Sequence, residues 1–337
     1  VSVLGPVGIN RERASFSIRD VNSSQYGRLD PVRSPEGPNI GLVTYLALYT
    51  KINEFGFLET PYKRIEKIKK GKEILSRVTD EIAYLTADDE VDKYITYSGI
   101  NINKDGYIED ERLPLRHNGN YSEGPSLLVD FIDVTPRQVI GASASLIPFL
   151  AHDEGNRSLM GSNMQCQSVP LINPESPIVG TGMETEIARG MSRVIYARHA
   201  GQVEYADAKT VEVKLDKKVD IVTSKADEIE ISDGGKREIY HLMKFKRTAH
   251  STCYNQKVIV SPGDKVKEGD LLVDGPSIER GELSLGRNLV IAYTSMSGYG
   301  FEDAILVSDK IVKDDLLTSI HIEEYEADIV DTKLGPE

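Results

Sequence analysis

The sequence has little cysteine, a deficit of basic charge and no long apolar run. Its 337 residues contain two cysteines, and 40 lysines and arginines face 53 acidic residues, which gives a formal net charge of −13. Because Cys166 and Cys253 lie far apart in sequence, a disulfide framework or a structural zinc site is not expected, and a reducing compartment is favoured. No apolar run approaches the length of a membrane span, and no signal peptide is visible. We therefore expect a soluble protein without membrane contact.

The acidic charge argues against a free-standing nucleic-acid-binding protein, because phosphate contacts need a basic surface. A segment of a large assembly differs, since much of its surface meets other protein and only local basic patches face nucleic acid. The clearest basic run, at residues 63–72, is interrupted by acidic residues and a glycine. We interpret it as a solvated hairpin, with nucleic-acid contact as the alternative.

Patterning divides the chain into three parts. Residues 1–46 are punctuated by glycine and proline, residues 47–137 alternate apolar and polar positions as β-strands do, and residues 138–337 form the remainder. Within this last part, KVIVSPGDKVKEGDLLVDG at 257–275 carries two similar turns between short apolar strands. The length allows two or three domains with their own cores. Both ends fall inside motifs, so we expect an internal piece of a longer polypeptide.

The stretch SPEGPNIGLV at 34–43 predicts a rigid loop. Its prolines fix the backbone, its glycines allow conformations closed to other residues, and Glu36 and Asn39 are left to contact a ligand. A plain turn before a buried strand is the alternative. Upstream, in VLGPVGINRERASFSIRD at 3–20, a Gly/Pro turn precedes two arginines flanking a glutamate, and alternating apolar residues at Phe16 and Ile18 predict a strand.

The segment HDEGNRSLMGSNMQCQ at 152–167 predicts a helix with Asp153 as its N-cap. Two adjoining stripes of this helix carry Asn156, Arg157, Met160, Asn163 and Met164. A guanidinium group offers a planar fork to phosphate oxygens, so Arg157 beside two asparagines suits recognition of a triphosphate. The alternative is an ordinary amphipathic helix with its methionines in the core.

A second candidate site is the carboxylate pair Glu302 and Asp303. We expect the pair at the mouth of two strands, NLVIAY and AILVSD, joined by a glycine-containing segment. Adjacent carboxylates point to opposite faces of an extended chain, so the alternative is one solvated carboxylate and no bound ion. A magnesium ion prefers oxygen ligands and keeps several waters.

These segments together resemble the β subunit of bacterial-type multisubunit RNA polymerase. The resemblance covers nearly the whole chain, and it continues in order through SLIPFLAHDEGNRSLMGSNMQCQSVP (145–170), VGTGMET (179–185), DGPSIERGELSLGRN (274–288), GYGFEDAILVSD (298–309) and DTKLGPE (331–337). It implies a mixed α+β, β-rich fold of several domains. These are a fork-loop and rifamycin-pocket segment at 1–46, an external β-rich module at 47–137, and an incomplete hybrid-binding core at 138–337. The core would hold part of a double-psi β-barrel and a segment like a barrel-sandwich hybrid domain.

The same resemblance implies a component of DNA-directed RNA polymerase, which makes RNA from ribonucleoside triphosphates on a DNA template. The implied partners are the β′ subunit, the α dimer, ω, sigma factor, template DNA and the RNA transcript. The implied location is the bacterial cytoplasm, with a plastid as the alternative.

Residue roles follow from the resemblance alone. Arg157 matches the arginine that contacts the phosphates of the incoming nucleotide, with Asn156 and Asn163 beside it. Glu302 and Asp303 match a pair near the second, nucleotide-borne Mg²⁺, which they would contact weakly or through water. The primary Mg²⁺ belongs to the β′ subunit, and the catalytic lysines lie beyond this chain. We therefore expect the isolated chain to be inactive.

The inhibitor pocket and the fork loop are implied in the same way. The pocket positions are Ser2, Leu4, Pro35, Asn39, Val43 and Cys166. Many relatives have arginine at the last of these positions, so rifamycin affinity is in doubt. Arg11 and Arg13 match fork-loop arginines that contact nucleic acid, and a surface Arg–Glu network is the alternative.

Two rival functions remain. The turns within 257–275 are also found in biotinyl or lipoyl carrier domains, but a carrier needs a lysine on an exposed hairpin tip, and none is present there. A non-catalytic scaffold or binding module derived from the polymerase fold would be free to lose Arg157, Glu302 and Asp303. All three are present, which favours the enzyme component.

Overall fold

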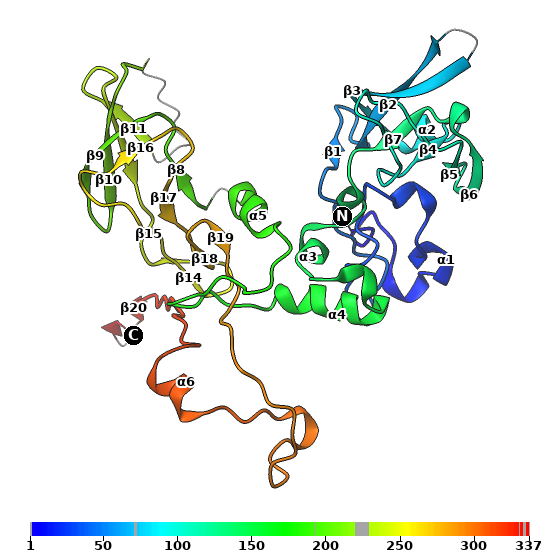
Figure 1. Cartoon of the computed structure of the whole chain (residues 1–337). Helices are drawn as coiled ribbons and strands as arrows, with labels where there is room; N and C mark the ends of the chain where they lie inside the picture. Colours follow the sequence, from blue (N-terminus) through cyan, green and yellow to red (C-terminus); the bar gives the residue numbers. More distant parts are fainter. Residues whose placement is uncertain are drawn as a thin grey trace. The chain divides into compact units, whose positions relative to one another are not determined.

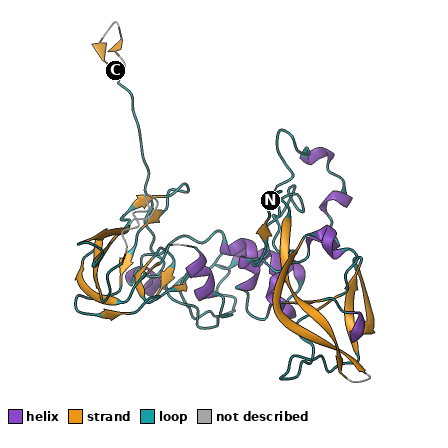
Figure 2. Cartoon of the chain, turned by 90° about the horizontal axis from the view of Figure 1, so that it is seen from above, coloured by secondary structure: helices purple, strands orange, loops and turns teal. Residues whose placement is uncertain are grey.

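The chain folds into two compact units, Val1–Gln167 and Ser168–Glu337. The computed structural model describes residues 2–70, 73–191, 193–219, 229–329, 331–332 and 335–336. Strands outnumber helices in the described chain, and most helices are short, as Figure 1 and Figure 2 show. The predicted class, mixed α+β and rich in β-structure, is confirmed.

The first segment of the chain consists of turns and short helices, η1 Arg11–Arg13, α1 Phe16–Arg19 and η2 Ser23–Gln25. The strand expected from the alternation at Phe16 and Ile18 is wrong. The chain makes a helical turn there, closed by the Asp20 amide, which donates to the Phe16 carbonyl at 3.2 Å. Both apolar side chains are exposed, and no strand of the described chain pairs with this segment.

A seven-stranded sheet forms most of the remaining first unit, in the order β1-β2-β7-β4-β5-β6, with β3 paired to β2. The strands are β1 Lys51–Ile52, β2 Leu58–Lys70, β3 Glu73–Leu85, β4 Ile95–Thr96, β5 Arg112–His117, β6 Asn120–Pro125 and β7 Phe131–Asp133. The basic run lies on the β2–β3 hairpin, as predicted, and residues 71 and 72 of that run are outside the described residues. Leu113, Leu115 and Val129 belong to the buried core of this sheet.

Among the described residues, six further helices belong to this unit, most of them short. They are α2 Ala87–Glu90, η3 Ser126–Leu128, η4 Pro136–Val139, α3 Ala142–Ser145, η5 Leu150–His152 and α4 Gly155–Gln165. The predicted helix at 152–167 is therefore confirmed as α4, but its N-cap is Glu154 and not Asp153. Asp153 instead ends η5, because its amide donates to the Leu150 carbonyl at 3.2 Å.

The methionines of α4 do not lie in the core of this unit. Met160 is 38% exposed and Met164 is 61% exposed, whereas the buried residues of the helix are Ser158 and Ser162. The alternative of an amphipathic helix with buried methionines is wrong within this chain. Small serines face inward, so the helix packs closely and leaves its larger side chains outside.

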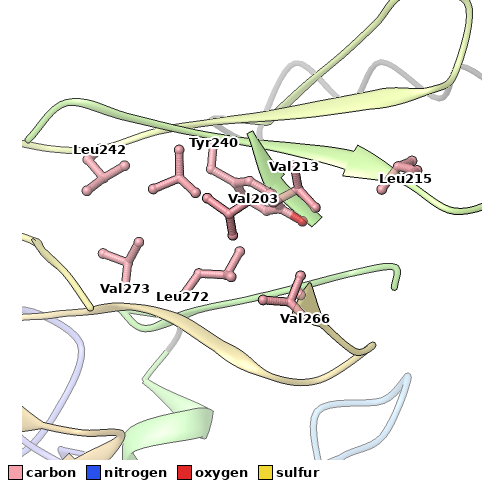
Figure 3. Close-up of a cluster of buried hydrophobic side chains, with 10 residues drawn as sticks. Val203, Val213, Leu215, Tyr240, Leu242, Val266, Leu272 and Val273 are labelled. Atoms are coloured by element: carbon pink, nitrogen blue, oxygen red, sulfur yellow. The ribbon is translucent and has the colours of Figure 1, made fainter. Parts of the chain in front are cut away.

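The second unit is built on two small sheets, with strand orders β11-β12-β10-β9-β16 and β15-β17-β8. Its strands are β8 Ile195–Tyr196, β9 Gly201–Ala206, β10 Thr210–Leu215, β11 Ile229–Ser232, β12 Arg237–His241, β13 Lys246–Arg247, β14 Cys253–Tyr254, β15 Lys257–Val258, β16 Lys265–Val266, β17 Leu271–Asp274, β18 Ile278–Glu279 and β19 Glu282–Leu283. Helix α5 spans Glu184–Gly190. Figure 3 shows side chains of both sheets meeting in one core, including Val203, Tyr240 and Leu272.

The two similar turns predicted at 257–275 are confirmed. In the first, the Ser261 amide donates to the Asp264 carboxylate at 2.7 Å; in the second, the Lys267 amide donates to the Asp270 carboxylate at 2.8 Å. Between the turns, Val266 is buried in the core. The turn tips are Pro-Gly and Glu-Gly, so neither presents a lysine at its centre.

The chain after β19 has little regular structure. It contains η6 Phe301–Asp303, α6 Asp309–Lys313, β20 Asp331–Thr332 and β21 Gly335–Pro336. The strands expected for NLVIAY and AILVSD are wrong, because residues 288–293 and 304–308 pair with no strand of the described chain. Their apolar side chains, including Tyr293 and Ile305, are exposed. A strand needs a partner for its backbone groups, and these segments have none here.

Within the residues that the structure describes, no helix is long and apolar enough to cross a membrane.

Candidate functional site

Helix α4 and the loop at residues 34–45 form a groove in the first unit. The groove has a volume of about 590 Å³ and is lined by Pro35, Glu36, Tyr45, Arg157, Met160, Asn163, Met164 and Gln167. We call it the loop–α4 groove. Residues from the predicted helix stripes, Arg157, Met160, Asn163 and Met164, thus line one groove with Pro35 and Glu36 of the predicted rigid loop.

The loop is held by hydrogen bonds at both ends. The Gly41 amide donates to Ser34 Oγ at 3.0 Å, and Asn163 Nδ2 of α4 donates to the Ser34 carbonyl at 2.8 Å. Arg19 Nη1 donates to the carbonyls of Pro38 and Ile40 at 2.7 and 2.9 Å. A Cβ added at Gly41, whose φ is +72°, would lie 2.3 Å from the Arg19 carbonyl oxygen, so this position requires glycine. The loop is therefore fixed without a ligand.

Arg33 stands behind the loop and connects three elements. Its guanidinium lies 3.6 Å from the centre of the Tyr45 ring, a cation–π contact. It also donates to Ser143 Oγ at 3.1 Å and to Cys166 Sγ at 2.7 Å. Cys166 is thus the sulfur partner of a guanidinium and not a free side chain. Sequence reasoning missed Arg33 and Tyr45, although an arginine directly before the Pro/Gly loop was a usable signal.

Arg157 is the positively charged side chain among the residues that line the groove, and no ion pair joins it to an acidic side chain of the described residues. Its side chain is exposed, and its one polar contact among the described residues is with Met160 Sδ, at 3.7 Å from Nη1. Asn163 uses its amide to hold Ser34, so it positions the loop as well as lining the groove. Asn156 does not line the groove, and its amide donates to Glu154 Oε1 at 3.0 Å. An unpaired guanidinium beside fixed polar groups can bind an anion such as a phosphate.

The N-terminal residues meet the far end of the same loop. Ser2 and Val43 form an antiparallel bridge, and the Val3 amide donates to the Leu42 carbonyl at 3.1 Å. The Leu4 amide donates to Ser2 Oγ at 3.2 Å. The structure therefore brings Ser2 next to Val43 of the loop that also carries Pro35, and Leu4 is hydrogen-bonded to Ser2.

Asn39 lies in the same loop, and its Oδ1 is buried without a hydrogen-bond partner in the described structure. Its backbone carbonyl accepts from the Leu42 amide at 3.0 Å.

Arg11 and Arg13, which the resemblance of the sequence to the family leads us to expect in a fork loop, lie in η1 and are exposed. In the described part of the chain, no ion pair joins Arg11 or Arg13 to Glu12, although the carbonyl of Arg11 accepts from Arg19 Nη2 at 3.3 Å. The alternative of a surface Arg–Glu network finds no support here. Both guanidinium groups remain available to an anionic partner.

The carboxylate pair lies in the second unit and in a different setting from the predicted one. Glu302 and Asp303 sit in the 3-10 turn η6 with φ of +52° and +64°, not at the mouth of two strands. Both are exposed, as are Phe301 and Ile305 beside them. Over the described ranges, no cluster of three or more acidic, histidine or cysteine side chains could hold a metal ion. Two exposed carboxylates suit at most an ion bound through water.

A buried ionic network was not foreseen from the sequence. Arg28, which is 3% exposed, donates to Glu90 Oε2 at 2.7 Å, and Arg116 Nη2 lies 3.7 Å from Glu90 Oε1 and 3.8 Å from Asp133 Oδ1. Tyr62 donates to Glu90 and accepts from Arg116. Burial, opposed by Arg116 and reinforced by Glu90, raises the pKa of Asp133 to about 6. Burial also raises the pKa of Tyr62, with a smaller opposing effect of Arg116. This network ties α2 to the sheet.

Comparisons with known proteins find similar sequences along the whole chain. The family described as RNA polymerase Rpb2, domain 6, matches residues 196–337; RNA polymerase Rpb2, domain 3, matches residues 1–52; and the RNA polymerase beta subunit external 1 domain matches residues 62–135. All 337 residues align with proteins named DNA-directed RNA polymerase subunit beta. Identity is 46% to that of Syntrophomonas wolfei, 44% to that of Streptococcus mutans and 43% to that of Streptococcus equi subsp. zooepidemicus. The chain spans 28% of the first and 26% of the other two, about a quarter of their length.

Proposed function

This chain belongs to the RNA polymerase β-subunit family, and from that premise we propose that it is the part of a bacterial-type β subunit that positions the incoming nucleotide and borders the path of nucleic acid. The activity of the whole enzyme is DNA-directed synthesis of RNA from ribonucleoside triphosphates. The chain contributes binding groups to that reaction and depends on other segments for the rest.

The unpaired guanidinium of Arg157 is the observation that carries the proposal. It faces a groove whose opposite wall is fixed by hydrogen bonds to Ser34 and Gly41. An unpaired cation of this kind can bind the phosphates of a nucleotide, and it would stabilise the negative charge that develops on the leaving pyrophosphate. Because the loop is already ordered, little ordering entropy is lost when the nucleotide binds.

We assign a lesser role to Glu302 and Asp303. As two exposed carboxylates on one turn, they fit a second Mg²⁺ that arrives with the nucleotide and is contacted through water. Such an ion neutralises phosphate charge in the transition state. The primary Mg²⁺ is assigned to the β′ subunit. The residues of this chain would only orient the nucleotide-borne ion.

The domain assignment remains as predicted from the sequence. Residues 1–46 are the fork-loop and rifamycin-pocket segment, residues 47–137 an external module, and residues 138–337 the hybrid-binding core with part of a double-psi barrel and a barrel-sandwich-like segment. The bridge between Ser2 and Val43 supports one pocket built from both N-terminal segments. The exposed Arg11 and Arg13 are assigned to nucleic acid.

The proposed partners are the β′ subunit, the α dimer, ω, sigma factor, template DNA and the transcript. Because the relatives named above are bacterial, we propose the bacterial cytoplasm as the location.

The test replaces Arg157 in the assembled polymerase. Arg157→Ala is expected to lower kcat/KM for the incoming nucleotide by about two to three decades, since one charge-assisted transition-state contact is worth roughly 2.7–4 kcal/mol. Arg112→Ala, which removes an exposed arginine from β5, serves as the matched control and should leave kcat/KM unchanged. DNA binding should be equal in both variants. Wild-type kinetics of Arg157→Ala at limiting nucleotide would reject the assignment and favour the non-catalytic scaffold.

A further inference from the structure

A second groove in the first unit lies between the tip of the β1–β2 hairpin and helix α2. Its volume is about 530 Å³. We name it the Phe55 groove. We propose that it docks an extended protein segment in which basic and aliphatic side chains alternate.

One part of the Phe55 groove is lined by a pair of solvent-exposed aromatic side chains on a hairpin tip held by hydrogen bonds. Phe55 is 85% exposed and Phe57 is 62% exposed. Asn53 holds the hairpin tip that carries them, because its Oδ1 accepts from the amides of Phe55 and Phe57 at 3.0 and 2.9 Å. The amide of Asn53 donates to the Phe57 carbonyl at 3.0 Å. Asn53 Nδ2 also donates to Glu59 Oε1 at 3.0 Å. Apolar area fixed in water in this way is typical of a binding surface.

Another part of the lining is acidic. It is the start of α2, where Asp88 and Asp89 lie within the first turn. Asp89 accepts from the amide and hydroxyl of Thr86 at 3.1 and 2.7 Å. These bonds, led by that from the hydroxyl, lower the pKa of Asp89 and keep it charged. Asp88 is exposed, and its carboxylate has no hydrogen bond or ion pair among the described residues. One carboxylate is therefore free to pair with an incoming cation.

The floor of the groove contributes no free positive charge. Arg28 lines it, but its guanidinium is bonded to Glu90 and to the carbonyls of Ser24, Leu58 and Leu85 at 2.7–3.2 Å. An anionic ligand would thus meet Asp88 and Asp89 without a compensating cation. This charge distribution disfavours nucleic acid and acidic peptides, and it complements a basic segment.

The aromatic and the acidic side chains of the groove together suit a partner segment in which aliphatic and basic side chains alternate. Successive side chains of an extended strand point to opposite sides, so one set can lie against the phenylalanines while the other reaches Asp88. Lysine and arginine suit the second role, because their stems cover apolar surface and their charged ends pair with carboxylates or lie over aromatic rings. Leucine, isoleucine or valine suit the first. The groove and the proposed segment thus match in charge and in apolar surface. This docking role is separate from the positioning of the nucleotide.

The experiment measures binding of three fluorescent heptapeptides to assembled polymerase by anisotropy. One peptide alternates lysine and leucine, one glutamate and leucine, and one lysine and serine. The lysine–leucine peptide is expected to bind at least tenfold more tightly than the other two. Asp88→Lys and the double change Phe55→Ala, Phe57→Ala should each weaken its binding at least tenfold.

Tyr121→Ala provides the matched control, since it removes an aromatic side chain that is 70% exposed on β6 of the same unit. It should leave binding of the lysine–leucine peptide unchanged. Unaltered RNA synthesis by every variant would show that each is folded. The proposal is overturned if the lysine–leucine peptide binds no more tightly than either comparison peptide. It is equally overturned if the Asp88 and phenylalanine variants bind that peptide as the parent enzyme does.

Discussion

The loop–α4 groove and the chain after β19 present their charged groups in opposite ways. In the groove, Arg157 faces a loop that hydrogen bonds from Asn163 and Arg19 hold in place. After β19, Glu302 and Asp303 lie on an exposed turn, and the apolar segments on either side pair with no strand of the described chain. The loop of the first region is held by hydrogen bonds from side chains of this chain. The second region has no comparable network of contacts among the described residues.

This difference separates two kinds of contribution to one reaction. A site held by its own hydrogen bonds can be judged from this chain, because its geometry is fixed before a ligand binds. A site on unpaired segments acquires its geometry on assembly. The following predictions test that separation.

The largest expected effect is the complete absence of activity in the isolated chain. The purified 337-residue chain should incorporate no labelled nucleotide on a primed template, since the primary metal ligands are assigned to the β′ subunit. Polymerase assembled with a β subunit containing the same residues is the positive control. Template-dependent incorporation by the isolated chain would contradict the proposed division of roles.

The exposed segments around Tyr293 and Ile305 should also make the isolated chain associate, so a monodisperse monomer with a cooperative melt would count against the comparison.

The next effect concerns the buried ion pair of the first unit. Arg28→Ala leaves Glu90 buried without its closest cation and should lower the free energy of unfolding by about 3–5 kcal/mol. Pulse proteolysis of the assembled polymerase, read as cleavage within β2 and β3, measures the change. Arg112→Ala should cause no change. Equal protection of the Arg28 and Arg112 variants would show that the network does not hold α2 to the sheet.

Asp133 provides a pH test of the same network. Its pKa in the folded protein is raised from 3.8 to about 6, so the folded state binds the proton more tightly than the unfolded state. The resulting stabilisation is fully present below pH 3.8 and is lost as pH rises through 6, a change of about 3 kcal/mol. Pulse proteolysis between pH 4.5 and 7.5 should therefore find the parent losing stability relative to Asp133→Asn as pH rises. A constant difference between the two proteins would refute the burial effect.

The smallest of these effects concerns the pocket formed by Ser2 and the rigid loop. Ser2→Leu removes a hydroxyl and adds bulk next to Val43, and an unpaired polar group on a bound ligand costs about 1–3 kcal/mol. Rifamycin affinity should fall more than tenfold while the elongation rate changes little. Both quantities must be compared within the same assembled enzyme, so that any effect of Cys166 on the starting affinity is common to parent and variant. If the parent and Ser2→Leu enzymes are both active and bind rifamycin equally well, the assignment of Ser2 to the pocket is rejected.

The sequence predicted those features that depend on local patterns. The helix at 155–165 follows from its apolar and small-residue spacing, the β2–β3 hairpin from alternation, and the turns at Asp264 and Asp270 from their Pro-Gly and Glu-Gly pairs. The loop at 34–43 follows from proline and glycine chemistry. In each case the residues that decide the structure lie within a few positions of one another.

Features that depend on distant partners were missed. The pattern at Phe16 and the segments flanking Glu302 resembled strands, but a strand forms only where another strand pairs with it. The network of Arg28, Glu90 and Asp133 joins residues far apart in sequence. Likewise, the contact of Arg33 with Cys166 spans 133 positions. The position of Arg33 before the Pro/Gly loop marks the arginine, but no local pattern marks its partner Cys166 or the members of the network.

The most direct test of the central claim asks whether Arg157 acts on the terminal phosphate of the nucleotide. Single-nucleotide addition by assembled polymerase should be measured for the parent and Arg157→Ala enzymes with a nucleoside triphosphate and with the matching diphosphate. We expect a loss of about 100- to 1,000-fold in kcat/KM with the triphosphate, and a loss at least tenfold smaller with the diphosphate, which lacks one phosphate for the guanidinium to contact. Equal losses with the two substrates, or no loss with the triphosphate, would contradict the account.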